Sequence, residues 1–150
     1  MDMHKLHDVA VHAATTAGGI IATHAGRHIT VKNKSAGSSE ASQVVTGVDH
    51  ICEDVIRTLL LPSCELYDLA LLTEETPDDG SRLIKDYFWC VDPLDGTLSY
   101  INNRPGFAVS IALVSRSGIP HIGVVYDPSI QVTYSAIKGN GANRNGMKWI

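Results

Sequence analysis

Two groups of acidic residues in this sequence could bind a metal ion together. One is the hexapeptide Asp92-Pro93-Leu94-Asp95-Gly96-Thr97, and the other is the pair Glu74-Glu75. Two carboxylates three positions apart on a tight turn can face one point, because Pro93 fixes φ and Gly96 permits a left-handed backbone. Oxygen donors without a neighbouring His or Cys favour Mg²⁺ over zinc or copper. The sequence therefore predicts a magnesium site.

The same residues also have a purely structural interpretation. Most sequences of the form D-P-x-D-G-T are only turns, and a Glu pair after a strand is usually solvated. Asp49, taken alone, is interpreted as a helix cap. The context favours a site, because two apolar segments each end in acidic residues. A helix beginning at Thr97 would also leave backbone N–H groups free to bind an anion.

Length and composition limit the class of protein. The 150 residues suit one domain, and 44% hydrophobic with 19% charged residues predict a packed core rather than disorder. A net charge of -4 argues against binding a nucleic-acid polymer. Three cysteines without a C-x-x-C pair fit a reduced, cytoplasmic environment. No apolar run reaches about 18 residues, so no membrane span is predicted.

Two helices are predicted ahead of the acidic residues. Apolar residues recur at helical spacing from Leu6 to Ala25, where the pair Gly18-Gly19 indicates a close contact. A mobile loop is expected from Lys32 to Ser42. A second helix should begin at the capping-box-like pair Thr46 and Asp49 and stop at Pro62.

The remaining segments predict strands. An apolar strand from Leu69 to Thr73 would deliver Glu74, and another from Tyr87 to Val91 would deliver Asp92 into a turn over residues 93–97. One or two helical turns are expected over residues 98–102. Period-two alternation then runs through residues 107–113, 122–126 and 132–136, which is typical of an antiparallel meander. The predicted fold class is α+β, with two N-terminal helices packed on a largely antiparallel sheet.

Three motifs together resemble a known family. In order and spacing, Val45-Thr46-Gly47-Val48-Asp49, Leu72-Thr73-Glu74-Glu75 and Trp89–Thr97 resemble the signatures of the inositol monophosphatase superfamily. Phe107–Leu113 and Gly139–Ala142 look like a strand and a turn that follow in that family. The resemblance spans about residues 5 to 150. It implies the first half of a layered α-β-α-β-α sugar-phosphatase fold.

The resemblance also implies roles for individual residues. The implied metal ligands are Glu74, Asp92, the backbone carbonyl of Leu94, and Asp95. Asp49 and Thr97, together with Glu74, would be catalytic and would orient and activate the attacking water. The amides of Gly96 and Thr97 would hold the phosphate, and Glu75 would support the ligands without touching the metal.

The implied activity is that of a Mg²⁺-dependent phosphomonoesterase that hydrolyses a small phosphate monoester with metal-activated water. Leu72–Glu75 and Gly123–Pro128 look nearer to the 3′(2′),5′-bisphosphate nucleotidase branch, whereas Phe107–Ile111 looks nearer to the inositol monophosphatase branch. The substrate could therefore be inositol monophosphate or a 3′(2′),5′-bisphosphate nucleotide. The expected partner is this small phosphorylated substrate, with no nucleic-acid polymer and no membrane.

This sequence departs from the family in its length. Family members are longer, and their second half supplies another metal-ligating aspartate, so residues 1–150 are expected to form an N-terminal metal-binding domain without the C-terminal domain. The sheet would then expose apolar surface, and we expect pairing as a homodimer or with a complementing chain. One alternative is a truncated, catalytically incompetent metal-binding or dimerisation module. Another is a structural α+β domain whose acidic turn is only a turn.

Overall fold

The computed structural model describes residues 1–25 and 40–149, and of residues 40–46 it describes only the helical backbone. Two long helices come first, α1 (Met3–His24) and α2 (Glu40–Tyr67). Two short helices follow later, a 3-10 turn η1 (Ser81–Leu83) and α3 (Thr97–Ile101). No helix in these ranges is long and apolar enough to cross a membrane.

In the described residues, seven strands form one sheet, and their order in the sheet is their order along the chain. They are β1 (Ala70–Thr73), β2 (Tyr87–Asp95), β3 (Ala108–Ser115), β4 (Pro120–Asp127), β5 (Val132–Ile137), β6 (Gly141–Arg144) and β7 (Met147–Lys148). β1 pairs with β2 in parallel, and every later pair is antiparallel. The predicted α+β class and the meander are confirmed, and the meander is extended by β6 and β7.

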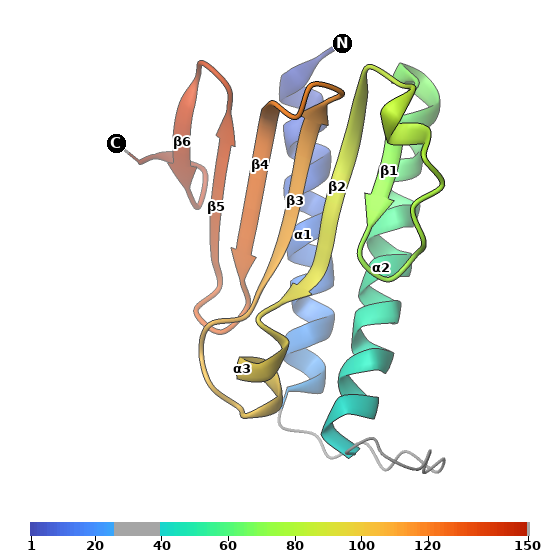
Figure 1. Cartoon of the computed structure of the whole chain (residues 1–150). Coiled ribbons are helices and arrows are strands. Elements are labelled where there is room, and N and C mark those ends of the chain that lie inside the picture. Colours follow the sequence, from blue (N-terminus) through green and yellow to red (C-terminus); the bar gives the residue numbers. More distant parts are fainter. Residues whose placement is uncertain (26–39, 150) are drawn as a thin grey trace.

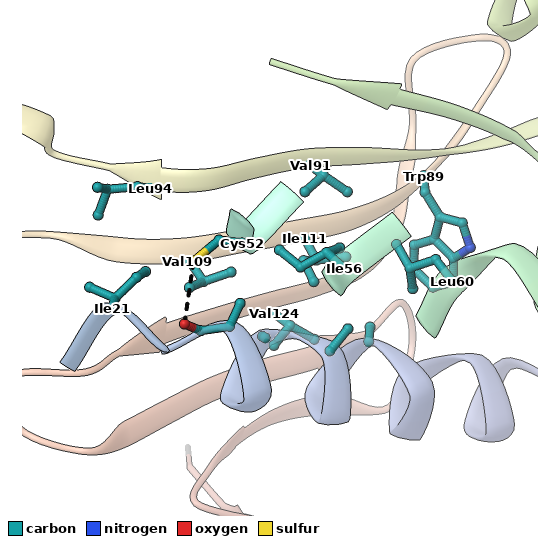
Figure 2. Packing of buried hydrophobic residues seen from close by; sticks show 14 of the residues in the cluster. Ile21, Cys52, Ile56, Leu60, Trp89, Val91, Leu94, Val109, Ile111 and Val124 are labelled. Carbon is teal, nitrogen blue, oxygen red and sulfur yellow. Dashed lines mark hydrogen bonds between the residues drawn. The ribbon is translucent and has the colours of Figure 1, made fainter. Parts of the chain in front are cut away.

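Helices α1 and α2 cover one face of the sheet (Figure 1). The core lies between the two layers and is made of fully buried side chains, among them Ile21, Ile56, Leu60, Trp89, Val91, Val109, Ile111 and Val124 (Figure 2). The thiol of Cys52 on α2 donates to the Ala17 carbonyl of α1 at 3.6 Å, so the two helices also touch directly. In the described part of the chain no helix covers the opposite face, where Val125 is 41% exposed.

Helix α1 agrees with its sequence pattern. Its first turn is capped by the Asp2 carboxylate, which accepts from the amides of His4 and Lys5 at 3.1 Å. Small buried residues let the helix lie close to the sheet. The close contact predicted for Gly18 and Gly19 is made by Gly18 alone, because the space next to Gly19 is open. A methyl group added at Gly18 would lie 2.1 Å from the ring of Tyr126 on β4.

Helix α2 differs from the prediction at both ends. It begins at Glu40, so the predicted start at Thr46 is wrong, and the part of the predicted loop over residues 40–42 is helical. Residues 32–39 of that loop lie outside the described residues. Asp49 is therefore in the helix interior and cannot be a cap. A capping-like sequence is only a local preference, and it does not prevent a helix from beginning further toward the N-terminus.

The predicted stop of α2 at Pro62 is also wrong, because the helix continues through Pro62 to Tyr67. Proline has no N–H, so the carbonyl four residues earlier in the helix loses its usual hydrogen bond. Because Pro62 lies on the exposed side of the helix, that carbonyl can bind water instead. The next residue, Ser63, is buried, accepts from Trp89 Nε1 at 2.9 Å and donates to the Leu60 carbonyl at 2.6 Å. This contact with β2 holds the last turns in place, and tertiary packing overrides the local cost of proline.

The contact between Gly18 and Tyr126 can be tested with a matched pair of substitutions. Gly18→Ala should lower the free energy of unfolding by about 1–3 kcal/mol, because the added methyl group overlaps the Tyr126 ring. Gly19→Ala, with open space around its position, should raise that free energy by about 0.5–1 kcal/mol. Urea unfolding followed by circular dichroism measures both. Equal stability of the two variants would contradict the contact.

Candidate functional site

The acidic residues meet where the two parallel strands end. The pairing of Thr73 with Val91 sets β1 and β2 side by side in the same direction, so Glu74 and Asp92 leave matching positions at one edge. The amide of Glu74 continues the ladder by donating to the Val91 carbonyl at 3.2 Å. The predicted strands therefore bring these two carboxylates together, as parallel strands generally do at their carboxyl ends.

Asp92 and Asp95 are positioned by a bulge and not by the predicted turn. Strand β2 runs on to Asp95, so the turn predicted over residues 93–97 is wrong for its first three residues. Asp92 pairs with Ser110, and Asp95 pairs with Ala108. Between these two pairs the chain advances three residues along β2 but only two along β3, so β2 contains one extra residue. The extra residue brings both aspartates to the same face of the sheet, which a regular strand would not do.

The chain bends at Gly96, which has φ 82° and ψ 37°. A Cβ atom at this position would lie 2.1 Å from the Gly106 carbonyl oxygen. The backbone just before β3 therefore comes so close that only glycine fits here, whatever the φ angle. Helix α3 starts at the next residue, as predicted. The Thr97 hydroxyl donates to the Leu94 carbonyl at 3.3 Å, which joins two groups that the sequence assigned to the site.

Asp49 faces the strand ends from helix α2. Its side chain is only 8% exposed, and its Oδ1 is buried without a hydrogen-bond partner among the described residues. Burial raises the pKa of Asp49 to about 7, and the charges of Glu75, Glu74 and Asp92 add to the effect. The helix therefore brings a third carboxylate toward those of the two strands.

The pKa of Asp92 is raised for the same reasons as that of Asp49. Burial raises its pKa to about 7, and the neighbouring Glu74 carboxyl contributes through a hydrogen bond and through its charge. The amide of Leu94, which donates to Asp92 Oδ1 at 3.1 Å, opposes this rise. Glu74 and Asp95 are themselves exposed, so the cluster is buried on the helix side and open toward solvent.

Sequence reasoning missed one acidic residue, Glu53. It lies one helical turn after Asp49, is 3% exposed and accepts hydrogen bonds from the β1–η1 connection. The signal was present in the pattern, because Val48, Cys52 and Ile56 form the buried stripe of α2 and Glu53 adjoins it.

The donors at this edge fit a hard divalent cation. Carboxylate oxygens are the ligands that Mg²⁺ prefers. Among the described residues, the orphaned Asp49 oxygen and the raised pKa values mark a cluster whose negative charge is not compensated. Among the side chains that the structure describes, in residues 1–25 and 47–149, no three from Asp, Glu, His or Cys lie close enough to hold one ion as they stand. Binding therefore requires these side chains to close on the ion.

The buried aspartate makes stability depend on pH. The pKa of Asp49 is about 7 in the fold against an ordinary 3.8, so the folded chain binds this proton more tightly than the unfolded chain. Without metal, stability should fall as pH rises from about 4 to about 7 and stay low above that range. Asp49→Asn should raise the free energy of unfolding at pH 8 by about 1–3 kcal/mol and weaken the pH dependence.

Urea unfolding at pH 5 and pH 8 with a chelator present measures this effect. The exposed Asp54 on the same helix provides the control, and Asp54→Asn should follow the unchanged chain at both pH values. Parallel pH profiles for Asp49→Asn and the unchanged chain would refute the account of Asp49.

Known proteins resemble this chain in sequence. Residues 2–149 match the model of the inositol monophosphatase family. Nus factor SuhB of Escherichia coli K12 is 37% identical over 147 residues, which cover 97% of this chain and 52% of that protein. The chain thus spans about half the length of the curated relatives it matches.

Solved structures agree with the sequence match. Inositol monophosphatase II of Staphylococcus aureus aligns over 96% of this chain and 50% of its own, with 29% identity and a TM-score of 0.78. CysQ of Bacteroides thetaiotaomicron, described as a bacterial member of the same family, aligns over 97% of this chain and 51% of its own, with 29% identity and a TM-score of 0.77. The chain belongs to the inositol monophosphatase family.

Proposed function

We propose that this chain carries the metal-binding half of a Mg²⁺-dependent phosphomonoesterase. The observation that supports this most is the buried Asp49 carboxylate, which faces Glu74, Glu75 and Asp92 and has one oxygen with no hydrogen-bond partner in the part of the chain that the structure describes. A structural domain gains nothing from gathering these charges, because each raises the cost of ionising the others. A cation site gains the negative field that attracts and holds the ion.

The proposed ligands are Glu74, Asp92, Asp95 and the Leu94 carbonyl. Bound Mg²⁺ would supply neutralisation of the phosphoryl charge and activation of a water molecule. The Thr97 hydroxyl, already held next to the Leu94 carbonyl, would orient that water together with Asp49. The amides of Gly96 and Thr97 would face the phosphate, since the first turn of a helix leaves its N–H groups without intrahelical partners.

The proposed substrate is a small phosphate monoester. One solved relative, SaIMPase-II, is described with inositol monophosphate bound and also with 2′AMP bound, and it aligns with TM-scores of 0.72 and 0.71. Inositol monophosphate is therefore one candidate substrate of the whole enzyme, and a 3′(2′),5′-bisphosphate nucleotide, which the resemblance of Leu72–Glu75 and Gly123–Pro128 implies, is the other. A cytoplasmic location is part of the proposal, and the free Cys52, Cys64 and Cys90 are compatible with it.

A second candidate is a non-catalytic module that binds metal or pairs with another chain. Two observations favour it. The curated relatives include proteins named Nus factor SuhB, a name that does not describe a phosphatase. In the described residues the acidic side chains also do not converge on one ion. Binding of metal without hydrolysis would select this candidate over the enzyme.

The proposal predicts that Asp92→Asn weakens Mg²⁺ or Mn²⁺ binding at least about tenfold, because an amide replaces a charged ligand. Isothermal titration calorimetry measures the binding. Phosphate release from inositol monophosphate and from adenosine 3′,5′-bisphosphate measures the turnover. Asp86→Asn is the matched control, since Asp86 is exposed just before β2, away from the cluster.

The outcomes separate the candidates. Metal binding with phosphate release, both lost in Asp92→Asn and kept in Asp86→Asn, supports the phosphomonoesterase. Metal binding by the unchanged chain without release of phosphate from either substrate supports the non-catalytic module. The absence of any metal binding would leave the acidic cluster as a structural feature and overturn both candidates.

A further inference from the structure

Glu53 is a buried carboxylate that none of the roles above uses. It lies on α2 with Asp49 one turn before it, and only 3% of it is exposed. Three groups donate hydrogen bonds to it: the Thr73 hydroxyl at 2.8 Å, the Glu75 amide at 2.8 Å, and the Thr76 hydroxyl. All three donors lie within residues 73–76, the segment that carries Glu74, so one side chain of the helix holds the end of β1 and the turn that follows it.

These contacts hold the backbone on both sides of Glu74. The peptide group before Glu74 is fixed by its own amide, which donates to the Val91 carbonyl at 3.2 Å. The peptide group after Glu74 is fixed by the Glu75 amide, which donates to Glu53 Oε2. With both neighbouring peptide planes held, the direction in which the Glu74 side chain leaves the backbone is set.

The charge of Glu53 does not explain its presence. The Glu53 carboxylate is one of the negative groups that raise the pKa of Asp49, so it adds to the repulsion among the carboxylates of the cluster. Its hydrogen bonds do explain it. Oxygen Oε1 accepts from the two threonine hydroxyls and Oε2 accepts from the Glu75 amide, so both oxygens are engaged by the same turn.

We propose that Glu53 is a positioning residue that holds the turn of Glu74 and Glu75, so that the Glu74 carboxylate faces Asp92 ready to bind the cation. The proposal rests on the proposed function, because it gives Glu74 the role of a metal ligand. Glu53 itself touches neither metal nor substrate. Outer contacts of this kind orient a ligand and change metal affinity by about ten- to a hundredfold when they are removed.

Three substitutions separate hydrogen bonding from charge. Glu53→Gln removes the charge but keeps the shape, and its amide can take the place of Oε1 because threonine hydroxyls also accept, while its carbonyl oxygen accepts from the Glu75 amide. Glu53→Asp keeps the charge but is one methylene shorter and cannot reach the turn. Glu53→Ala removes both. Glu65 is exposed on the same helix, and Glu65→Ala and Glu65→Gln are the matched controls.

Two measurements on the 150-residue chain provide the test. Mn²⁺ binding followed by electron paramagnetic resonance should weaken about tenfold or more in Glu53→Ala and Glu53→Asp and stay within about twofold in Glu53→Gln. Amide hydrogen exchange by NMR should show loss of protection at Glu75 in the first two variants, with unchanged protection in β3 and β4. If Glu53→Ala does not fold, Thr76→Val, which removes one donor, should show the same changes to a smaller extent.

Wild-type Mn²⁺ affinity in Glu53→Ala and Glu53→Asp would overturn the proposal. Equal losses in Glu53→Gln and Glu53→Ala would overturn it as well, since charge and not hydrogen bonding would then be responsible. If the unchanged chain binds no Mn²⁺, the proposed function is wrong. The anchoring of the turn by Glu53 is then decided by Glu75 exchange alone, with full protection in Glu53→Ala as the contrary result.

Discussion

The rest of the structure around the ends of β1 and β2 depends on the repulsion among carboxylates that are partly buried there. Asp49 and Asp92 both have a pKa of about 7, and in each case burial is the largest cause and neighbouring acids add to it. Such a cluster destabilises the fold at neutral pH unless protons or a cation neutralise it. The two aspartates come from a helix and a strand that pack against each other, so the repulsion cannot relax without disturbing the core.

The core supplies what holds these groups together. Trp89 is buried between the sheet and α2, and its indole N–H donates to Ser63, which fixes the position of the helix along the strand. The pairing of β1 and β2, the parallel pair of the sheet, places both strand ends at one edge. Glu53 then joins the helix to the segment after β1. The same packing that buries apolar area thereby determines where the charges lie.

The sequence predicted what depends on local pattern. Continuous apolar runs predicted β1 and β2, and alternation predicted β3, β4 and β5. The acidic residues at the ends of β1 and β2 predicted the candidate site. The predicted start of α2 was wrong because Thr46 and Asp49 match a cap locally, and a local cap pattern does not exclude a helix that begins earlier. The bulge between Asp92 and Asp95 depends on register with β3, which one strand's sequence does not contain. Glu53 was missed because an acid on a helix normally faces solvent, and its partners lie about twenty residues away.

Anomalous diffraction from crystals grown with Mn²⁺ would show whether these carboxylates are gathered to hold a divalent cation. We expect an anomalous peak within ligand distance of Glu74 and Asp92, about 2–2.5 Å from their oxygens, with Asp49 turned toward the ion. Crystals with Mn²⁺ bound elsewhere, or with these side chains still apart around solvent, would contradict it.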